Sequence, residues 1–187
     1  MRGRHNVPKE GAFILAANHA SNADPFILGT SFYRPVEYLA KEELFNHPFS
    51  RWIFTSFHAH PVRRGNGDYR AMKETFKILQ SGKPLLIFPE GTRSRNGRLQ
   101  PGKPGVGFIV NKLNVPVVPV YIEGSYDAMP EDIKTLRRRP VKIYIGSPMR
   151  FDGLPNGVRG KEVYQEISDR IMNRIASLKS EYEGKAS

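Results

Sequence analysis

A histidine and an aspartate five positions apart are the residues best placed to do chemistry in this chain. His19 and Asp24 follow the apolar run of residues 12–17, and Pro25 comes directly after Asp24. Histidine titrates near neutral pH, so His19 could act as a general base if a carboxylate held its other ring nitrogen. Asp24 is the expected partner, because five residues can span a tight turn. The alternative is that Asp24 is a helix cap beside an unrelated histidine.

No activated nucleophile accompanies this pair in the sequence. There is no G-x-S-x-G elbow, the chain lacks cysteine, and Ser21 lies only two residues from His19 without a strained turn to present it. A covalent acyl-enzyme stays open but has no support. The simpler hypothesis is that His19 removes a proton from a hydroxyl of the substrate itself.

A second charged loop follows the apolar residues 85–88. Gly91 would let the backbone approach a ligand closely, and the amides of Gly91 and Thr92 could hold a phosphate together with Arg93. Glu90 is unusual directly after a buried strand unless it has a chemical task or a partner. The alternative is that Glu90 and Arg93 form an ion pair that closes a turn, and both interpretations can hold together.

Other polar candidates lie between these two loops or beyond them. Arg63 and Arg64 form a guanidinium pair suited to a phosphomonoester. His58 and His60 resemble a metal pair, but no cysteine or carboxylate set with zinc spacing accompanies them, so we interpret them as loop residues. The run Arg137–Arg139 is interpreted as a solvated surface or a patch for anionic headgroups.

Strands that alternate with helices must position the two charged loops. The expected strands are residues 11–17, 36–40, 85–88, 117–122 and 141–145, with a short edge strand at 61–62. The expected helices are residues 25–32, 42–57 with a break at Pro48, 69–82 with Asp68 as its cap, 105–113 and 161–182. This order predicts an α/β domain with a largely parallel central sheet flanked by helices. Ligands of such sheets bind beyond the carboxyl ends of the strands, where both charged loops fall.

Length and charge restrict the remaining possibilities. The chain has 187 residues, which fits one domain over 1–187, with a core at about 6–150 and a C-terminal helix at about 160–183. A net charge of +11 favours a polyanionic partner such as nucleic acid, an anionic membrane or a phosphorylated substrate. The lack of cysteine fits a reducing compartment. No signal-peptide core or run of about 18 apolar residues is present, so we expect a chain that is soluble or lies on a surface.

The two loops together resemble the lysophosphatidic acid acyltransferase family, also called 1-acylglycerol-3-phosphate O-acyltransferases. Residues 18–24 and 88–94 are similar to its first and third sequence blocks. Residues 61–64 resemble its second block, whose arginine falls on Arg64, and residues 115–120 resemble its fourth. The four blocks occur in the family's order and cover most of the chain from about Asn6.

This resemblance implies a glycerol-phosphate acyltransferase-like fold and direct acyl transfer to a lysophospholipid hydroxyl. The donor would be a thioester, either acyl-CoA or acyl carrier protein, as a co-substrate rather than a bound cofactor. It also implies that His19 is the general base, that Asp24 orients it, and that Arg64, Glu90, Gly91, Thr92 and Arg93 bind the glycerol phosphate. We expect the enzyme to be peripheral on the cytoplasmic face of an anionic membrane and to take part in phospholipid biosynthesis.

The second block departs from the family pattern, which leaves the acceptor open. The family has Gly at its start and a Phe and an acidic residue before the arginine, whereas this chain has His58, Pro61 and Arg63. A different lysophospholipid or an amino-lipid is therefore an alternative acceptor. A non-catalytic nucleic-acid-binding module is a third hypothesis, but it lacks an RNP-like or GXXG signature and would give the His19–Asp24 pair no role. Basic surface with exposed aromatics near residues 45–57 is the expected membrane contact.

Overall fold

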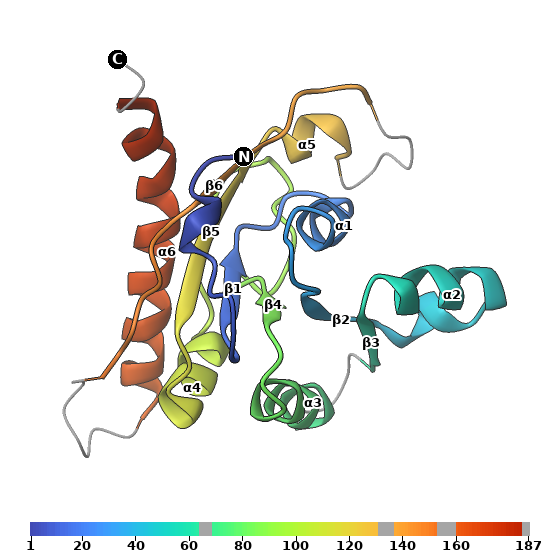
Figure 1. Ribbon diagram of the computed structural model, residues 1–187, viewed down its shortest axis with the longest axis horizontal. Coiled ribbons are helices and arrows are strands. Elements are labelled where there is room, and N and C mark those ends of the chain that lie inside the picture. Colours follow the sequence, from blue (N-terminus) through green and yellow to red (C-terminus); the bar gives the residue numbers. More distant parts are fainter. Residues whose placement is uncertain (64–68, 131–136, 153–159, 185–187) are drawn as a thin grey trace.

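The computed structural model describes residues 1–63, 69–130, 137–152 and 160–184, and a six-stranded sheet forms its centre (Figure 1). The strands are β1 (Ile14–Ala17), β2 (Glu37–Lys41), β3 (Ala59–Val62), β4 (Leu85–Ile87), β5 (Val117–Glu123) and β6 (Lys142–Ile145). The helices are α1 (Asp24–Gly29), α2 (Pro48–Ser56), α3 (Tyr69–Gln80), α4 (Pro104–Leu113), α5 (Ser125–Ala128) and α6 (Lys161–Gly184), with short 3-10 turns η1 (Arg4–Asn6) and η2 (Glu42–Phe45).

The strand order β3-β2-β4-β1-β5-β6 places β1 inside the sheet, between β4 and β5. Leu15 pairs with Leu86 on one side and with Val118 on the other, and both pairings are parallel. Only β6 runs antiparallel, against β5. The predicted α/β class with a largely parallel sheet is therefore confirmed, and the loops that leave β1 and β4 start at the same edge of the sheet.

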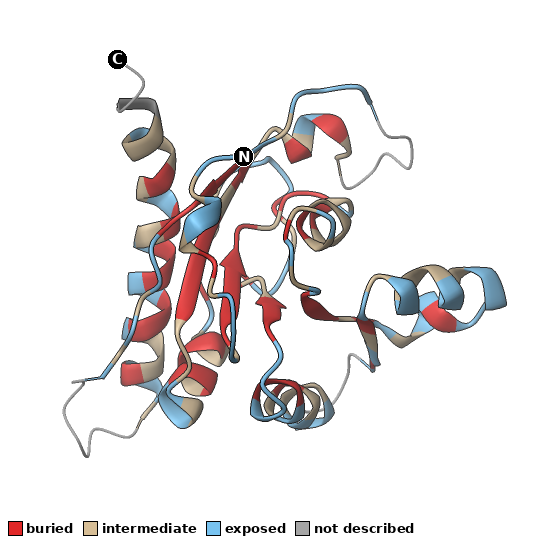
Figure 2. Cartoon of the chain, viewed as in Figure 1, coloured by how far each residue is buried: buried red, intermediate tan, exposed pale blue. Residues whose placement is uncertain are grey.

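The alternation of side chains along β1 divides the core into two layers. Ile14 and Ala16 face a layer built with α3, α4 and α6, whereas Leu15 and Ala17 face a layer built with α1. All four residues of this strand are buried, as expected for a strand covered on both faces (Figure 2). The covered sheet gives the site a rigid base.

Close packing of α4 against α6 depends on one glycine. A Cβ atom at Gly107 would overlap the carbonyl oxygen of Tyr164 in α6. At Gly105, two residues earlier on α4, a Cβ would meet nothing within 4 Å. The missing side chain at Gly107 thus lets the two helices approach closely.

The segment expected as one helix over 42–57 is divided at Pro48, as its proline indicated. Residues 42–45 form η2, and α2 begins at Pro48, where the missing amide would have no partner in any case. His47 precedes it, and its Nδ1 accepts a hydrogen bond from the amide of Phe49 at 3.2 Å. None of the residues of α2 is buried, and the helix stands out from the sheet (Figures 1 and 2).

Three other sequence expectations have different outcomes in the structure. His60 does not lie in a loop, because Ala59–Val62 pairs with β2 in the sheet; the predicted edge strand at 61–62 is present and begins two residues earlier. The expected cap at Asp68 lies outside the residues that the structure describes. Arg137–Arg139 is exposed, in agreement with a solvated surface run.

Candidate active site

His19 and Asp24 are joined by a hydrogen bond at the carboxyl end of β1. The distance from His19 Nδ1 to Asp24 Oδ2 is 2.9 Å. A carboxylate can only accept, so in the neutral form of the imidazole the proton belongs on Nδ1 and the lone pair on Nε2. The Asp24 side chain is fully buried and that of His19 is 15% exposed. The pair therefore combines a ring held in one orientation with partial exposure of that ring, as a general base requires.

Asp24 does not cap the helix that follows it, contrary to one of the sequence interpretations. The cap position of α1 is Ala23, and Asp24 is the first residue of the helix. Its carboxylate points back over the preceding loop, where Oδ2 also accepts from the amides of Ala20 and Ser21, each at 2.8 Å. These bonds fix the loop that carries His19, so the carboxylate holds both the ring and its backbone.

Glu90 holds the backbone of the same histidine from the loop that follows the neighbouring strand β4. Its Oε1 accepts from the amide of His19 at 2.8 Å, and its Oε2 accepts from the amide of Gln100 at 3.0 Å. The side chain is almost wholly buried. Burial raises the pKa of Glu90 to about 7, the two amide hydrogen bonds oppose that rise, and the charge of nearby Asp24 adds to it. The task of Glu90 in this structure is thus to bind two backbone amides.

In the rest of this loop, Gly91 closes a turn and is followed by the polar residues Thr92 and Arg93. The amide of Gly91 donates to the carbonyl of Phe88 at 2.9 Å, so it closes a turn and is not directed at a ligand as the sequence suggested. Gly91 has φ +67°, and a Cβ there would meet the side chain of Lys103 at 2.9 Å. Thr92 is exposed, and the half-buried Arg93 donates to Asn22 Oδ1 at 2.6 Å.

Three contacts in the two loops after β1 and β4 were not anticipated from the sequence. The ring of Phe88 stacks on the imidazole with centroids 3.8 Å apart and planes inclined by 11°. Asn18 forms two hydrogen bonds with the backbone of Ile122 in β5, at 2.7 and 3.0 Å. Lys103 brings an ammonium group against Gly91. The motif itself contained Asn18 and Phe88, but residue type alone did not indicate what each would touch.

The remaining candidates lie elsewhere or outside the described residues. Arg64 belongs to the segment 64–68, of which the structure gives no placement. Arg63 is exposed and pairs with Glu42. His60 lies between two carboxylates, with Nε2 2.7 Å from Glu37 and Nδ1 3.1 Å from Glu74. Across the described ranges no group of His, Cys, Asp and Glu side chains has the arrangement of a metal site.

Comparisons with known proteins identify the family to which the chain belongs. The model of the family described as Acyltransferase matches residues 1–123. The chain is 30% identical to the 1-acyl-sn-glycerol-3-phosphate acyltransferase of Bacillus subtilis, over 90% of this chain and 83% of that protein. It is 29% identical to the chloroplast enzyme of Brassica napus named 1-acyl-sn-glycerol-3-phosphate acyltransferase BAT2, over 80% of this chain but only 44% of that longer protein.

A solved structure shares the fold. The crystal structure of the 1-acyl-sn-glycerophosphate (LPA) acyltransferase from Thermotoga maritima superposes with a TM-score of 0.76 at 31% identity, and the match covers 95% of this chain and 70% of that one. The family match, the sequence similarity and the shared fold lead to one conclusion. This chain belongs to the acyltransferase family that includes these 1-acyl-sn-glycerol-3-phosphate acyltransferases.

Proposed function

We propose that this protein transfers a fatty acyl group to the free sn-2 hydroxyl of 1-acylglycerol-3-phosphate, which gives phosphatidic acid for phospholipid biosynthesis. The observation that carries the proposal is the His19–Asp24 hydrogen bond, with a buried carboxylate behind an accessible ring. Family membership supplies the acyl-transfer chemistry. The donor is a thioester, acyl-CoA or acyl carrier protein, and it enters as a co-substrate.

In this mechanism His19 serves as the only proton carrier. Nε2 takes the proton of the acceptor hydroxyl as its oxygen attacks the thioester carbonyl, and the buried Asp24 stabilises the imidazolium that forms. When the tetrahedral intermediate collapses, the C–S bond breaks and the imidazolium returns the proton to the departing thiolate. An ester and a thiol result, and the enzyme ends in its starting protonation state.

The loop after β4 is proposed to hold the phosphate of the acceptor. Thr92 is exposed and Arg93 is half-buried on this loop, and a guanidinium is suited to a phosphomonoester. Arg64 would add a second guanidinium from the segment after β3. Glu90 and Gly91 would not contact the phosphate themselves. The side chain of Glu90 fixes the backbone of His19, and the turn at Gly91 fixes the loop.

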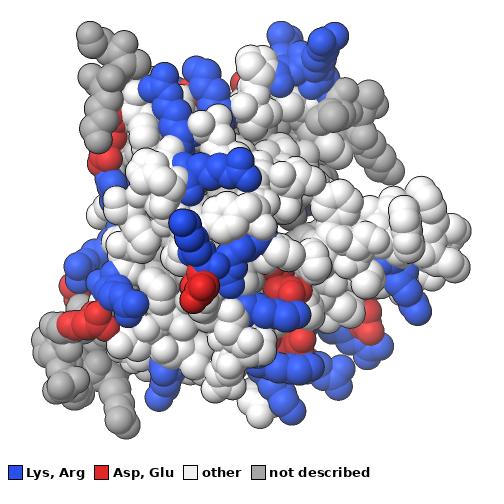
Figure 3. Space-filling view, in the orientation of Figure 1, with Lys and Arg blue, Asp and Glu red and all other residues white. Residues whose placement is uncertain are grey.

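We further propose that the protein works as a peripheral enzyme on the cytoplasmic face of an anionic membrane. Its net charge of +11 favours anionic headgroups over neutral ones. Lys and Arg side chains are spread widely over the face shown in Figure 3. Among the helices that the structure describes, none has the length and apolar character needed to cross a bilayer.

Turnover of a panel of lysophospholipids with palmitoyl-CoA or palmitoyl-acyl carrier protein tests the proposal. We expect His19→Ala to lower kcat by about 10²–10⁴-fold, the usual contribution of a general base, with an unchanged circular dichroism spectrum. His5→Ala, at an exposed position in η1, is the matched control and should keep wild-type rates. A His19→Ala enzyme with wild-type turnover would exclude this mechanism, and preference for another acceptor in the panel would correct the substrate.

A further inference from the structure

The outward side of α2 presents two large aromatic rings to solvent. Phe49 is 64% exposed and Trp52 is 66% exposed. Their rings stack with centroids 6.3 Å apart, and Leu44 of η2 is also exposed. Large apolar side chains gathered in this way on one element mark an interaction surface more often than chance exposure does.

The inward side of the same helix is well packed, so the exposure does not reflect a loosely held element. Phe54 contacts Phe45 and Phe26 with centroid distances of 5.5 and 5.6 Å. Phe57, at the end of the helix, packs edge-on against Phe26 at 5.0 Å. The helix is therefore anchored through one set of aromatic rings while another set remains uncovered.

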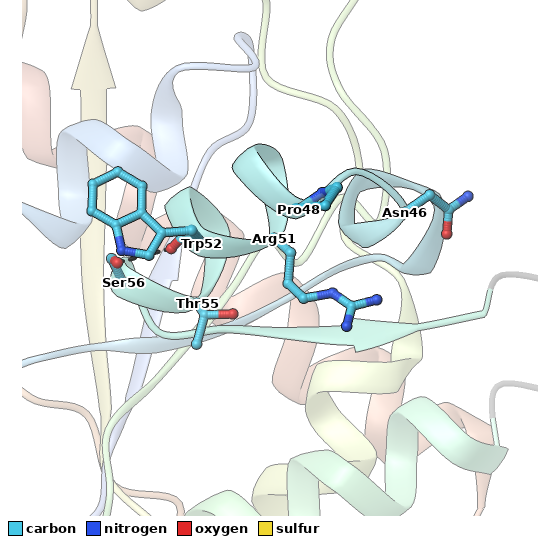
Figure 4. Close-up of a pocket in the computed structure, with 6 residues that line it drawn as sticks. All are labelled: Asn46, Pro48, Arg51, Trp52, Thr55 and Ser56. Atoms are coloured by element: carbon cyan, nitrogen blue, oxygen red, sulfur yellow. Dashed lines mark hydrogen bonds between the residues drawn. The ribbon is translucent and has the colours of Figure 1, made fainter.

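Helix α2 itself carries one basic side chain and no acidic one. Residues 46–58 contain one arginine and no acidic residue, whereas the preceding η2 carries Glu42, which pairs with Arg63, and the exposed Glu43. The attraction to anionic lipid therefore comes from Arg51 together with the overall net charge of +11. Arg51 is exposed, and its Nε donates to the carbonyl of Phe45 at 3.1 Å, which holds the guanidinium beside the helix. It lies in a shallow groove with polar and apolar walls (Figure 4). The lining residues are Asn46, Pro48, Arg51, Trp52, Thr55 and Ser56.

The shape of this region fits a flat and deformable partner. Helix α2 projects from one end of the molecule in Figure 1, and Figure 3 shows the same region as a largely uncharged protrusion with basic and acidic groups below it. A convex element with apolar rings and a neighbouring guanidinium matches the boundary between headgroups and acyl chains of a bilayer.

We propose that α2 docks this protein on anionic bilayers, with Phe49 and Trp52 inserted among the lipids and Arg51 at the level of the phosphates. The proposal rests on the proposed function in one respect, namely that the acceptor is itself a membrane lipid. Phe26, which anchors α2, lies two residues after Asp24 in α1. Docking through α2 thus connects the bilayer to the loop of His19 through a single layer of aromatic packing.

The chain contains its own reporter, because Trp52 is its only tryptophan. We expect vesicles of phosphatidylglycerol and phosphatidylcholine to shift the Trp52 emission to shorter wavelength and to shield it from iodide. Lipids brominated on the acyl chain should quench it. Vesicles of phosphatidylcholine alone should bind more weakly, and high salt should reduce binding to the anionic vesicles.

Substitutions identify the docking element. Phe49→Ser and Arg51→Gln should each weaken sedimentation with anionic vesicles by about tenfold, because each removes one contact with the bilayer. Tyr69→Ser, at a 78% exposed aromatic residue of α3, is the matched control and should bind like the wild type. Vesicle binding without any change in Trp52 emission, or a loss with Tyr69→Ser equal to that with Phe49→Ser, would overturn the proposal, as would absence of binding to anionic vesicles.

A second measurement separates this inference from the proposed reaction. A short-chain lysophosphatidic acid that stays monomeric in water requires no docking, so Phe49→Ser should keep wild-type turnover with it and lose turnover with acceptor embedded in vesicles. If the wild type binds vesicles through Trp52 but acylates neither form, the proposed function fails and the docking surface stands. If Phe49→Ser matches the wild type on both forms of acceptor, the docking surface fails and the reaction stands.

Discussion

Replacing Glu90 by glutamine tests whether this carboxyl is as strongly perturbed as its surroundings imply. Burial raises its pKa from the ordinary value of 4.5 to about 7. Such a rise corresponds to about 3 kcal/mol of destabilisation of the ionised form in the folded state. Below the unfolded-state pKa both states are protonated and there is no penalty. As the pH rises toward 7, the unfolded chain loses this proton and the folded chain keeps it, so the free energy of unfolding falls; above 7 the whole penalty persists.

Glutamine at this position does not titrate, so the variant lacks that pH dependence. The amide oxygen of the new side chain can accept from His19 or Gln100, but its NH₂ group meets the other backbone amide, donor against donor. An unmatched donor costs about 1–3 kcal/mol at any pH. We therefore expect the stability difference, wild type minus Glu90→Gln, to shrink by about 3 kcal/mol between about pH 4.5 and about pH 8.

Urea unfolding of both proteins across this pH range measures the difference directly, because titrations shared by the two proteins cancel. Glu166→Gln, at an exposed position of α6, is the matched control, and its stability relative to the wild type should change little. A wild-type minus Glu90→Gln difference that stays constant within about 1 kcal/mol would show that burial does not raise the pKa of Glu90 in the folded protein. Turnover of the variant, measured at the same time, reports how much the site depends on the bond to the His19 amide.

Two further predictions concern close contacts. Gly107→Ala should lower the free energy of unfolding by about 1–3 kcal/mol, because its Cβ would force α4 away from Tyr164, whereas Gly105→Ala should be neutral or slightly stabilising. Thermal or urea unfolding compares the two, and equal effects would contradict the packing argument. Phe88→Leu should lower kcat by roughly 2–10-fold while the KM for the acceptor stays the same, since the lost stacking on His19 is worth about 0.5–1.5 kcal/mol. An unchanged kcat would mean that Asp24 alone suffices to hold the ring.

Local features were the ones that sequence patterns predicted well. His19 and Asp24 are five residues apart on one turn, so their contact requires no knowledge of the rest of the fold. The proline at 48 divided the expected helix because its missing amide acts within one turn of the backbone. The expected strands and helices were found along the described chain because apolar periodicity reflects burial on each element separately.

Contacts between distant segments were predicted less well. Across the loop, Glu90 accepts a hydrogen bond from the backbone amide of Gln100. Every residue except proline has such an amide, so the sequence could not indicate which one Glu90 would bind. A helix cap and a side chain that binds the amides of a preceding loop both require a short hydrogen-bond acceptor such as aspartate. The position of Asp24 before a proline therefore could not distinguish the two roles. Likewise, an apolar strand does not reveal its neighbours, so the place of β1 between β4 and β5 came only from the structure.

Asn18 shows how the chain passes from building a sheet to building a site. Its side-chain amide donates to and accepts from Ile122, as a peptide group of a strand would, so the ladder to β5 is extended one residue beyond β1 by a side chain. The backbone amide and carbonyl of the next residue, His19, are therefore not used in the pairing of β1 with β5. The amide of His19 binds Glu90, and its carbonyl accepts from Ser94 at 2.7 Å. Because the Asn18 side chain takes the place of a backbone group in the sheet, the backbone of His19 is free to bond to Glu90 and Ser94 in the loop after β4.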